Sequence, residues 1–217
     1  MSLSVDRRLR EHLLATAHAM SAAGLNTGTA GNVSVRIAGG MLITPSGMPP
    51  ASCSPDDMVI VAGDGTATGR LAPSSEWRFH HDLYARRPEA GAILHAHAPF
   101  ATSLACQRIE IPPFHYMIAR FGGNTVRCAR YATFGTQALS DHILAAMEGR
   151  SACLMANHGM LVFGRDLDNA LDLAIEFETL CEQYWRTRQL GEPVVLSDAE
   201  MAEVVERFRW YGKPRAA

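Results

Sequence analysis

Apolar residues recur along this 217-residue chain at two spacings, one typical of helices and the other of short strands. Residues 5–23 carry apolar side chains every three or four positions, which predicts a helix that ends at Gly24. A second helix is expected from Pro73-Ser74-Ser75-Glu76 to about Arg86, because serine caps its start and an acidic residue lies in its first turn. The same spacing predicts helices at about 136–148, 168–190 and 198–210.

Short apolar runs predict the strands. Asn32–Ile37 and Met41–Thr44, separated by Gly39-Gly40, have the pattern of a tight hairpin. Further strands are expected at 58–62, 92–97, 153–155 and 160–163. Helices and strands interleave without a strict βαβ rhythm, and several neighbouring strands are linked as hairpins. We therefore expect one domain over residues 1–217, an α/β layered fold whose sheet is largely antiparallel.

Composition and charge exclude several classes of protein. No apolar run approaches the roughly 20 residues that cross a bilayer, and the first residues have the pattern of an amphipathic helix, not of a signal peptide. A formal net charge of −2 without basic clusters gives no attraction to nucleic acid. The five cysteines are far apart, odd in number and never spaced as CxxC, which argues against a disulfide framework and against a zinc ribbon. We expect a soluble cytoplasmic protein that binds neither nucleic acid nor membranes.

Lysine is almost absent from the chain. Lys213, in the C-terminal tail, is the only lysine among the 20 basic residues. Schiff-base catalysis needs a lysine that can lose its proton in an apolar pocket, and a tail position is a poor candidate. Carbonyl chemistry in this protein would therefore require a metal ion as its electrophile.

Three histidines form a candidate metal site. His95 and His97 lie on an expected strand, where residues two apart share a face, so both imidazoles could bind one ion. The pair alone is weak, because nine histidines often produce such spacing, and two hydrogen-bonded histidines are the structural alternative. His158 follows another strand, where Gly159 permits a sharp turn. Three imidazoles with an open position are typical of catalytic zinc, and Glu76 is a candidate acid–base group beside them.

The remaining histidines have structural interpretations. Glu76 and His80 form the nearest rival pair, because residues four apart share a helix face. His80 and His81 are expected to belong to the helix and its packing, since adjacent helical residues diverge. The other histidines on amphipathic helices are expected at the surface, namely His12, His18 and His142.

Small-residue corners form a candidate anion site. Three segments could present backbone N–H groups to a phosphate: Thr29-Ala30-Gly31-Asn32, Thr44-Pro45-Ser46-Gly47 and Ser74-Ser75. None matches the P-loop or the GxGxxG pattern. Each by itself is as well explained as a turn, a hairpin corner or a helix cap. Their combination with a metal site is what favours a phosphate-bearing substrate.

These motifs together resemble the class II aldolase/adducin family, nearly from end to end, and within it the L-fuculose-1-phosphate aldolase branch. The family motifs are Gly28–Arg36, Leu42–Gly47, Pro73–His80, His95-Ala96-His97 and Asn157-His158-Gly159. His115-Tyr116-Met117-Ile118 and Tyr131–Thr136 are similar to that branch in particular. The resemblance implies a three-layer α/β/α domain and a C4 homotetramer with active sites at subunit interfaces.

The resemblance also implies roles for individual residues. His95, His97 and His158 would bind zinc, and Glu76 would bind the free metal and then handle the proton at C3. Tyr116 would reach a neighbouring subunit's site and donate a proton to the aldehyde oxygen; without the motif it would be expected to be a buried tyrosine with a satisfied hydroxyl. The substrate phosphate would contact Asn32, Ser46, Gly47, Ser74 and Ser75, with Thr29 and Gly31 shaping the loop and Phe134 and Tyr211 shaping the aldehyde pocket.

The implied reaction is zinc-dependent, reversible cleavage of a ketose 1-phosphate similar to L-fuculose 1-phosphate. The products would be dihydroxyacetone phosphate and a small aldehyde such as L-lactaldehyde. Alternatives are an aldolase for 5-deoxypentulose 1-phosphates, a related epimerase or dehydratase, and a non-catalytic adducin-like domain. Glu76 with Tyr116 favours an aldolase, and the histidine trio disfavours the adducin-like domain. Ser46, where threonine is usual, and the C-terminal residues 210–215 depart from the family pattern, the latter in the region that would set aldehyde preference.

Overall fold

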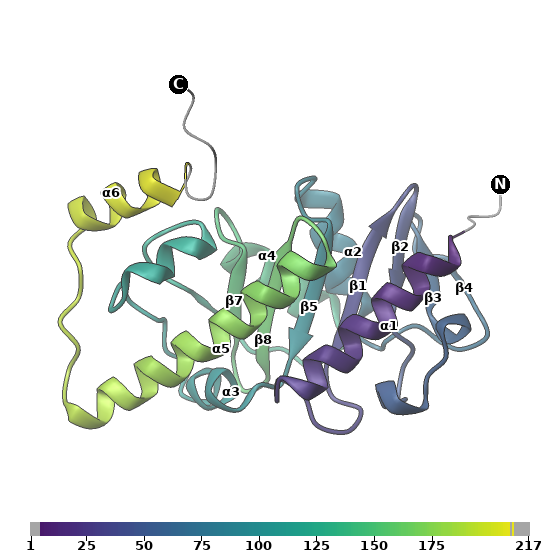
Figure 1. The fold of residues 1–217 in the computed structure, drawn as a ribbon, viewed down its shortest axis with the longest axis horizontal. Coiled ribbons are helices and arrows are strands. Elements are labelled where there is room, and N and C mark those ends of the chain that lie inside the picture. Colours follow the sequence, from purple (N-terminus) through teal and green to yellow (C-terminus); the bar gives the residue numbers. More distant parts are fainter. Residues whose placement is uncertain (1–4, 209, 211–217) are drawn as a thin grey trace.

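The computed structural model describes residues 5–208 and Trp210, and an eight-stranded sheet runs through its centre (Figure 1). The strands lie in the order β4-β3-β2-β1-β5-β8-β7-β6, and every neighbouring pair is antiparallel except β6 and β7. Their bounds are β1 Asn32–Ile37, β2 Gly40–Ile43, β3 Val59–Ala62, β4 Ala67–Thr68, β5 Ala92–Ala96, β6 Cys128–Ala129, β7 Ala152–Met155 and β8 Gly159–Gly164. The expected α/β fold with a largely antiparallel sheet is confirmed.

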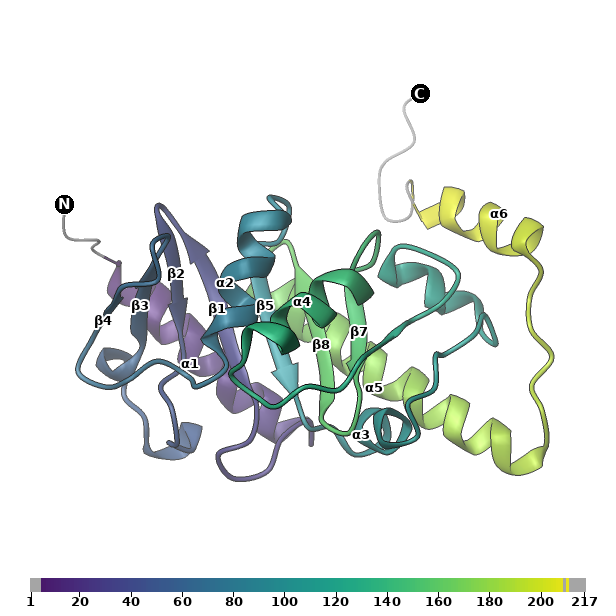
Figure 2. The same ribbon diagram turned by 180° about the vertical axis from the view of Figure 1, so that it is seen from behind.

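Helices cover both faces of the sheet and make three layers. Helices α1 and α5 cross one face, and α2 and α4 cover the other (Figures 1 and 2). The helices are α1 Arg7–Ala22, α2 Trp77–Arg86, α3 Pro99–Cys106, α4 Gln137–Ala146, α5 Leu167–Leu190 and α6 Asp198–Phe208, with short 3₁₀ helices at Pro50–Ser52, Pro55–Asp57 and Tyr116–Phe121. Within the described residues, no helix has the length and apolar character needed to span a membrane.

Two apolar cores follow from the alternation of side chains along the strands. On β2, Leu42 packs toward α1 and α5, while Met41 and Ile43 pack toward α2 and α4. The central strands are covered on both faces, which is why they read as nearly continuous apolar runs. β1 is the exception, because Asn32 and Ser34 are polar and yet buried.

Some local expectations are corrected by tertiary contacts. Helix α3 was not expected from its sequence, because its cap comes from a distant residue. The Glu178 side chain on α5 accepts hydrogen bonds from the backbone N–H groups of Phe100 and Ala101, in the first turn of α3, at 2.7 and 2.9 Å. Helix α2 begins at Trp77, so Glu76 occupies the N-cap position and not the first turn. Strand β5 ends at Ala96, so His97 follows the strand.

Candidate metal centre

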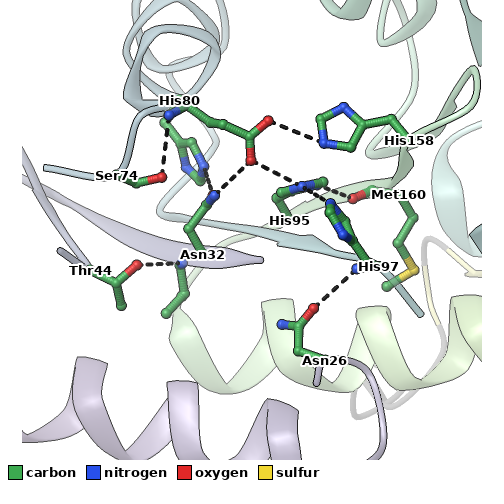
Figure 3. A network of polar contacts seen from close by, with 11 residues as sticks. Asn26, Asn32, Thr44, Ser74, His80, His95, His97, His158 and Met160 are labelled. Carbon is green, nitrogen blue, oxygen red and sulfur yellow. Dashed lines mark hydrogen bonds and ion pairs between the residues drawn. The ribbon is translucent and has the colours of Figure 1, made fainter. Parts of the chain in front are cut away.

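The three candidate histidines lie on or directly beside β5 and β8, which are neighbouring strands of the sheet. His95 lies on β5, His97 directly after it, and His158 in the corner that joins β7 to β8. Pairing of β5 with β8 places that corner beside the end of β5. One ring nitrogen from each histidine lies within 4.8 Å of the others, and Nε2 of His95 is 3.1 Å from Nε2 of His97 (Figure 3).

The orientation of His95 suits metal binding. Its Nδ1 lies 2.9 Å from the carbonyl oxygen of Met160. Because a carbonyl can only accept, Nδ1 carries the hydrogen, and in the neutral ring the lone pair is on Nε2, which faces the other histidines. Burial, together with repulsion from His95 and His158, lowers the pKa of His97 to about 4, so this ring is neutral near pH 7. Neutral imidazoles are the form that binds metal ions.

Glu76 supplies a buried carboxylate next to the histidines. Its side chain is buried, and Oε2 accepts a 3.1 Å hydrogen bond from Asn32 and lies 3.2 Å from Nε2 of His95. Oε1 lies 3.2 Å from Nε2 of His158 but has no partner with hydrogen-bond geometry. Burial opposes ionisation most strongly, yet the attraction of His95 and His158 outweighs it and holds the pKa of Glu76 well below its usual range. The group is therefore an ionised carboxylate with one oxygen left unsatisfied.

These residues fit a divalent cation. A buried negative charge, an unsatisfied carboxylate oxygen and three converging ring nitrogens call for a positive charge at one point. Burial opposes a charge on His95, but the nearby Glu76 carboxylate outweighs it and raises the pKa of His95, so the surroundings favour positive charge here. Three histidines with one carboxylate form a donor set typical of zinc, although other first-row ions bind the same donors.

A pocket of about 320 Å³ opens beside this centre. His97, His158 and Glu76 are among the residues that line it. All eight substrate-contacting residues expected from the sequence and described by the structure also line it: Thr29, Gly31, Asn32, Ser46, Gly47, Ser74, Ser75 and Phe134. Tyr211, the ninth, lies outside the described residues. The geometry thus brings the candidate anion corners into one cavity with Glu76, His97 and His158, and His95 lies buried beside them.

The loop before β1 needs glycine for two reasons. Gly31 has a φ of +73°, a left-handed conformation that other residues rarely adopt. A Cβ at this position would also lie 2.3 Å from Nδ2 of Asn26. The Asn26 side chain in turn accepts a 3.0 Å hydrogen bond from the backbone N–H of His97, so this loop is tied to the metal centre.

The anion corners differ in detail from the expectation of free backbone donors. The backbone N–H of Ser46 donates to the carbonyl of Ala72, and that of Ser74 donates to the carbonyl of Thr44, each at 3.0 Å. These two residues therefore offer a ligand their hydroxyl groups and not their backbone N–H groups. The Oγ of Ser74 also accepts a 3.3 Å hydrogen bond from the backbone of Glu76, which fixes the start of α2.

The corner that carries His158 is built differently from the expected glycine turn. Asn157, with a φ of +54°, is the left-handed residue. Its side-chain oxygen accepts a 2.7 Å hydrogen bond from Arg108. Gly159 is required for another reason, because a Cβ there would lie 2.4 Å from the carbonyl oxygen of Ala96. Close approach of β8 to β5, and not the turn, explains this glycine.

Tyr116 is not among the residues that line the pocket. It begins a 3₁₀ helix, its side chain is 49% exposed, and its ring stacks on Phe208 at 6.4 Å between centroids. The alternative interpretation of a buried tyrosine is therefore wrong. Its expected role as a proton donor in a neighbouring subunit's site stays a prediction.

Sequence reasoning missed several residues of the site. Tyr131 and Asn157 line the pocket, and Asn26 binds the backbone of His97. Tyr131 and Asn157 lie within recognised motifs, so motif membership was a usable signal for them; no spacing or composition marks Asn26. His80, expected to belong to helix packing, is indeed fully buried, but its ring nitrogens contact Ser34 and Asn32.

Comparison with known proteins agrees with this geometry. A model of the class II aldolase and adducin N-terminal domain family matches residues 11–185. The chain is 54% identical to a 5-methylthioribulose-1-phosphate/5-deoxyribulose-1-phosphate aldolase of Rhodospirillum rubrum, over 94% of this chain and 92% of the relative. It is 45% identical to the L-fuculose phosphate aldolase of Escherichia coli, over 94% and 96% of the two chains. A solved L-fuculose 1-phosphate aldolase superposes with a TM-score of 0.91 at 39% identity, covering 94% of this chain and 98% of that one.

Proposed function

The chain belongs to the class II aldolase and adducin family and is a lyase of the class II aldolase type, and on this basis we propose that it reversibly cleaves a ketose 1-phosphate into dihydroxyacetone phosphate and a small aldehyde. The observation that carries the proposal is the position of Glu76, whose unsatisfied carboxylate oxygen lies 3.2 Å from His158 beside the pocket. An acid–base group, a metal centre and a cavity lined by hydroxyls are thereby adjacent.

The metal centre would be held by His95, His97 and His158, with Glu76 as a further ligand while no substrate is bound. Zinc is the ion we propose, because three imidazoles that leave an open position are typical of catalytic zinc. When bound, such an ion supplies Lewis-acid stabilisation of the negative charge that develops on a carbonyl oxygen. The hydrogen bond from His95 to the Met160 carbonyl would keep the ring in the binding tautomer.

The proton balance of the reaction requires two acid–base groups. When C3–C4 breaks, the hydroxyl at C4 loses its proton to become the aldehyde, and C3 takes up a proton to become dihydroxyacetone phosphate. Glu76 would exchange the C3 proton and Tyr116 the proton on the aldehyde oxygen. Ionised Glu76 is in the state that removes this proton in the condensation direction.

The substrate phosphate would lie in the part of the pocket lined by the small-residue corners. Ser46, Ser74 and Ser75 contribute hydroxyl groups there, and Gly47 allows close approach of the backbone. Thr29 and Gly31 shape the adjoining loop. Asn32 has a smaller part than expected, because its side-chain oxygen faces His80 and its amide already donates to Glu76.

We propose 5-deoxypentulose 1-phosphates, including the 5-methylthio compound, as the substrate class. The sequence motifs placed L-fuculose 1-phosphate first, but the relative at 54% identity is named for the methylthioribulose and deoxyribulose compounds. Tyr131 and Phe134 give the pocket an aromatic wall that suits a methyl or thioether tail. L-Fuculose 1-phosphate is the second candidate, favoured by the solved aldolase of that name with a TM-score of 0.91.

We also propose a homotetramer in which Tyr116 completes a neighbouring chain's site. The position of this residue supports it: Tyr116 is half-exposed and lies outside the pocket of its own chain. Phe134, expected to shape the pocket for the aldehyde, is also largely exposed.

The experiment is a substrate panel. Zinc-loaded protein is incubated with 5-deoxyribulose 1-phosphate, 5-methylthioribulose 1-phosphate and L-fuculose 1-phosphate, and release of dihydroxyacetone phosphate is followed with a coupled dehydrogenase. The two deoxypentulose compounds should give the highest kcat/KM, and the Glu76→Gln protein is the matched control. Preference for L-fuculose 1-phosphate would select the second candidate, and no release from any compound would overturn the aldolase assignment.

A further inference from the structure

A buried polar stripe on β1 leads to the proposed acid–base group. Val33 and Val35 face the apolar core beneath α1, and Asn32 and Ser34 face α2. Alternation of this kind ordinarily marks a strand with one face in water. Here both faces are covered, with Asn32 6% and Ser34 0% exposed. Polar groups buried in this way must find partners within the protein.

Their partners form one continuous chain of hydrogen bonds. The Tyr84 hydroxyl lies 2.9 Å from Oγ of Ser34, and that oxygen lies 2.8 Å from Nδ1 of His80. Nε2 of His80 lies 2.5 Å from Oδ1 of Asn32 (Figure 3). The amide of Asn32 then donates to Oε2 of Glu76 at 3.1 Å. We call Tyr84, Ser34, His80 and Asn32 the relay.

The direction of each bond is fixed by the one beside it. The Glu76 carboxylate can only accept, so Asn32 presents its amide nitrogen and turns its oxygen to His80. Nε2 of His80 must therefore donate. A neutral ring then accepts at Nδ1 from the hydroxyl of Ser34, and Ser34 accepts in turn from Tyr84.

His80 is suited to this single arrangement. Its side chain is fully buried on α2, and burial lowers its pKa to about 3, so the ring is neutral. Phe79 stacks on it with ring centroids 4.8 Å apart, which limits reorientation of the imidazole. A flipped Asn32 amide would place its oxygen against the Glu76 carboxylate, two acceptors, and its NH2 group against the N–H of His80, two donors. Both mismatches cost free energy in a buried site.

We propose that His80 is a positioning residue that acts through Asn32 to hold the carboxylate of Glu76 in one rotation. Asn32 occupies Oε2, which leaves Oε1, the oxygen without a hydrogen bond, as the one that binds a cation or exchanges the substrate proton. The inference rests on the proposed function only in taking Glu76 as the acid–base group. The competing explanation is that His80 only fills space and satisfies its own nitrogens.

The test compares two substitutions of His80. His80→Gln keeps an N–H near the position of Nε2, whereas His80→Leu fills a similar volume without a donor. His81→Gln is the matched control, because His81 is the next residue on α2 and its ring contacts Gly63 and Asp82, outside the relay. Ser34→Ala, a smaller change that releases the tautomer of His80, serves if His80→Leu does not fold.

Two measurements are made on each variant after its melting temperature has been checked. The first is kcat and KM for ketose 1-phosphate cleavage. The second is the visible spectrum and affinity of the protein loaded with Co²⁺ alone, which reports the metal environment without turnover. We expect His80→Leu to lose about 10-fold to 100-fold in kcat with a smaller change in KM, and to have an altered Co²⁺ spectrum. His80→Gln should recover most of both properties, and His81→Gln should match the wild type.

The outcomes separate the two proposals. Wild-type kcat and Co²⁺ spectrum in His80→Leu, or equal losses in His80→Gln and His80→Leu, would overturn the positioning role. If the wild-type protein cleaves no ketose 1-phosphate, the proposed function fails, and the Co²⁺ spectra decide the positioning role by themselves. A spectrum altered in His80→Leu and restored in His80→Gln would then still support it.

Discussion

The floor and the mouth of the pocket are organised in opposite ways. The floor is the metal centre, made of His95, His97, His158 and Glu76. Here Glu76 and His95 are buried, and each makes fixed contacts to β1, β5 or β8 of the same chain. At the mouth, Tyr131 and Phe134 are 54% and 63% exposed. The floor is complete within one chain, whereas the mouth leaves apolar surface uncovered. The groups at the floor are therefore preorganised, and in the proposed tetramer a neighbouring chain would add to the surface at the mouth.

Physical chemistry gives the reason for this difference. A charged group on the floor must be oriented before the reaction, because reorganisation during catalysis raises the barrier. Aromatic rings at the mouth gain their stabilisation only when a ligand or another chain covers them. Changes at the floor should therefore have large effects on kcat, and changes at the mouth should have small effects on selectivity.

Removal of the metal is the most severe disruption of the floor. Protein dialysed against a chelator should lose ketose 1-phosphate cleavage to below detection, because no other electrophile is available to a chain with a single lysine. Added Zn²⁺ should restore activity with one ion per chain, measured by elemental analysis and the coupled assay. Wild-type turnover in metal-free protein would contradict the histidine assignment.

Glu76→Gln should have the next largest effect. The amide keeps the shape of the side chain but cannot exchange the C3 proton, so kcat should fall about 10²-fold to 10⁴-fold. The protein should still bind metal through its three histidines. Exchange of the C3 hydrogen of dihydroxyacetone phosphate with D₂O, followed by NMR, should fall in parallel. A variant that keeps its zinc and exchanges at the wild-type rate would refute this role.

Tyr116→Phe tests whether the mouth is completed by another chain. Loss of the hydroxyl should lower kcat about 10²-fold. Each variant by itself should keep only this reduced activity, but chains of Tyr116→Phe and Glu76→Gln, dissociated and reassembled together, should form some sites with both groups intact. Recovered activity in the mixed assembly would show that the site is shared. If mixing restores nothing while both proteins assemble, Tyr116 acts within its own chain or not at all.

Acid should lower the free energy of unfolding of the metal-free protein, in part because His80 is buried in its neutral form. Its pKa is about 3 in the folded protein and about 6.5 when unfolded, so the unfolded chain binds a proton between these values and the folded one does not. The contribution of His80 to the free energy of unfolding is therefore complete above pH 6.5. It decreases as the pH drops toward 3, by at most about 1.4 kcal/mol per pH unit. Urea unfolding at pH 7, 6 and 5 should show a shallower decline for His80→Gln. Equal declines in the two proteins would exclude His80 as the source.

Phe134→Ala should produce the smallest effect and change selectivity more than rate. Loss of the exposed ring should lower kcat/KM for 5-methylthioribulose 1-phosphate by a few-fold to 10-fold, with a smaller loss for 5-deoxyribulose 1-phosphate. Differences of one small apolar group are worth about 1–3 kcal/mol in a pocket. Competition between the two substrates in one assay gives this ratio directly. An unchanged ratio would remove Phe134 from tail recognition.

The sequence determined much of the fold and part of the site. Apolar spacing predicted α1 and α5 and the β1–β2 hairpin, because each segment's pattern matches its own secondary structure. The motif resemblance predicted the family, the three layers and the set of residues that gathers around the pocket. These features are encoded in short segments, so they could be read without the fold.

Tertiary structure alone decided how these groups are oriented. Some features depend on a neighbour that is distant in sequence or on a strained backbone conformation that no residue spacing predicts. They are the N-cap position of Glu76, the left-handed conformation of Asn157 and the capping of α3 by Glu178. The role of His80 could not be read from its helix, because its partners lie on β1, 46 and 48 residues away. A sequence shows which polar groups exist; only the packed structure shows which of them are buried together and must therefore bind one another.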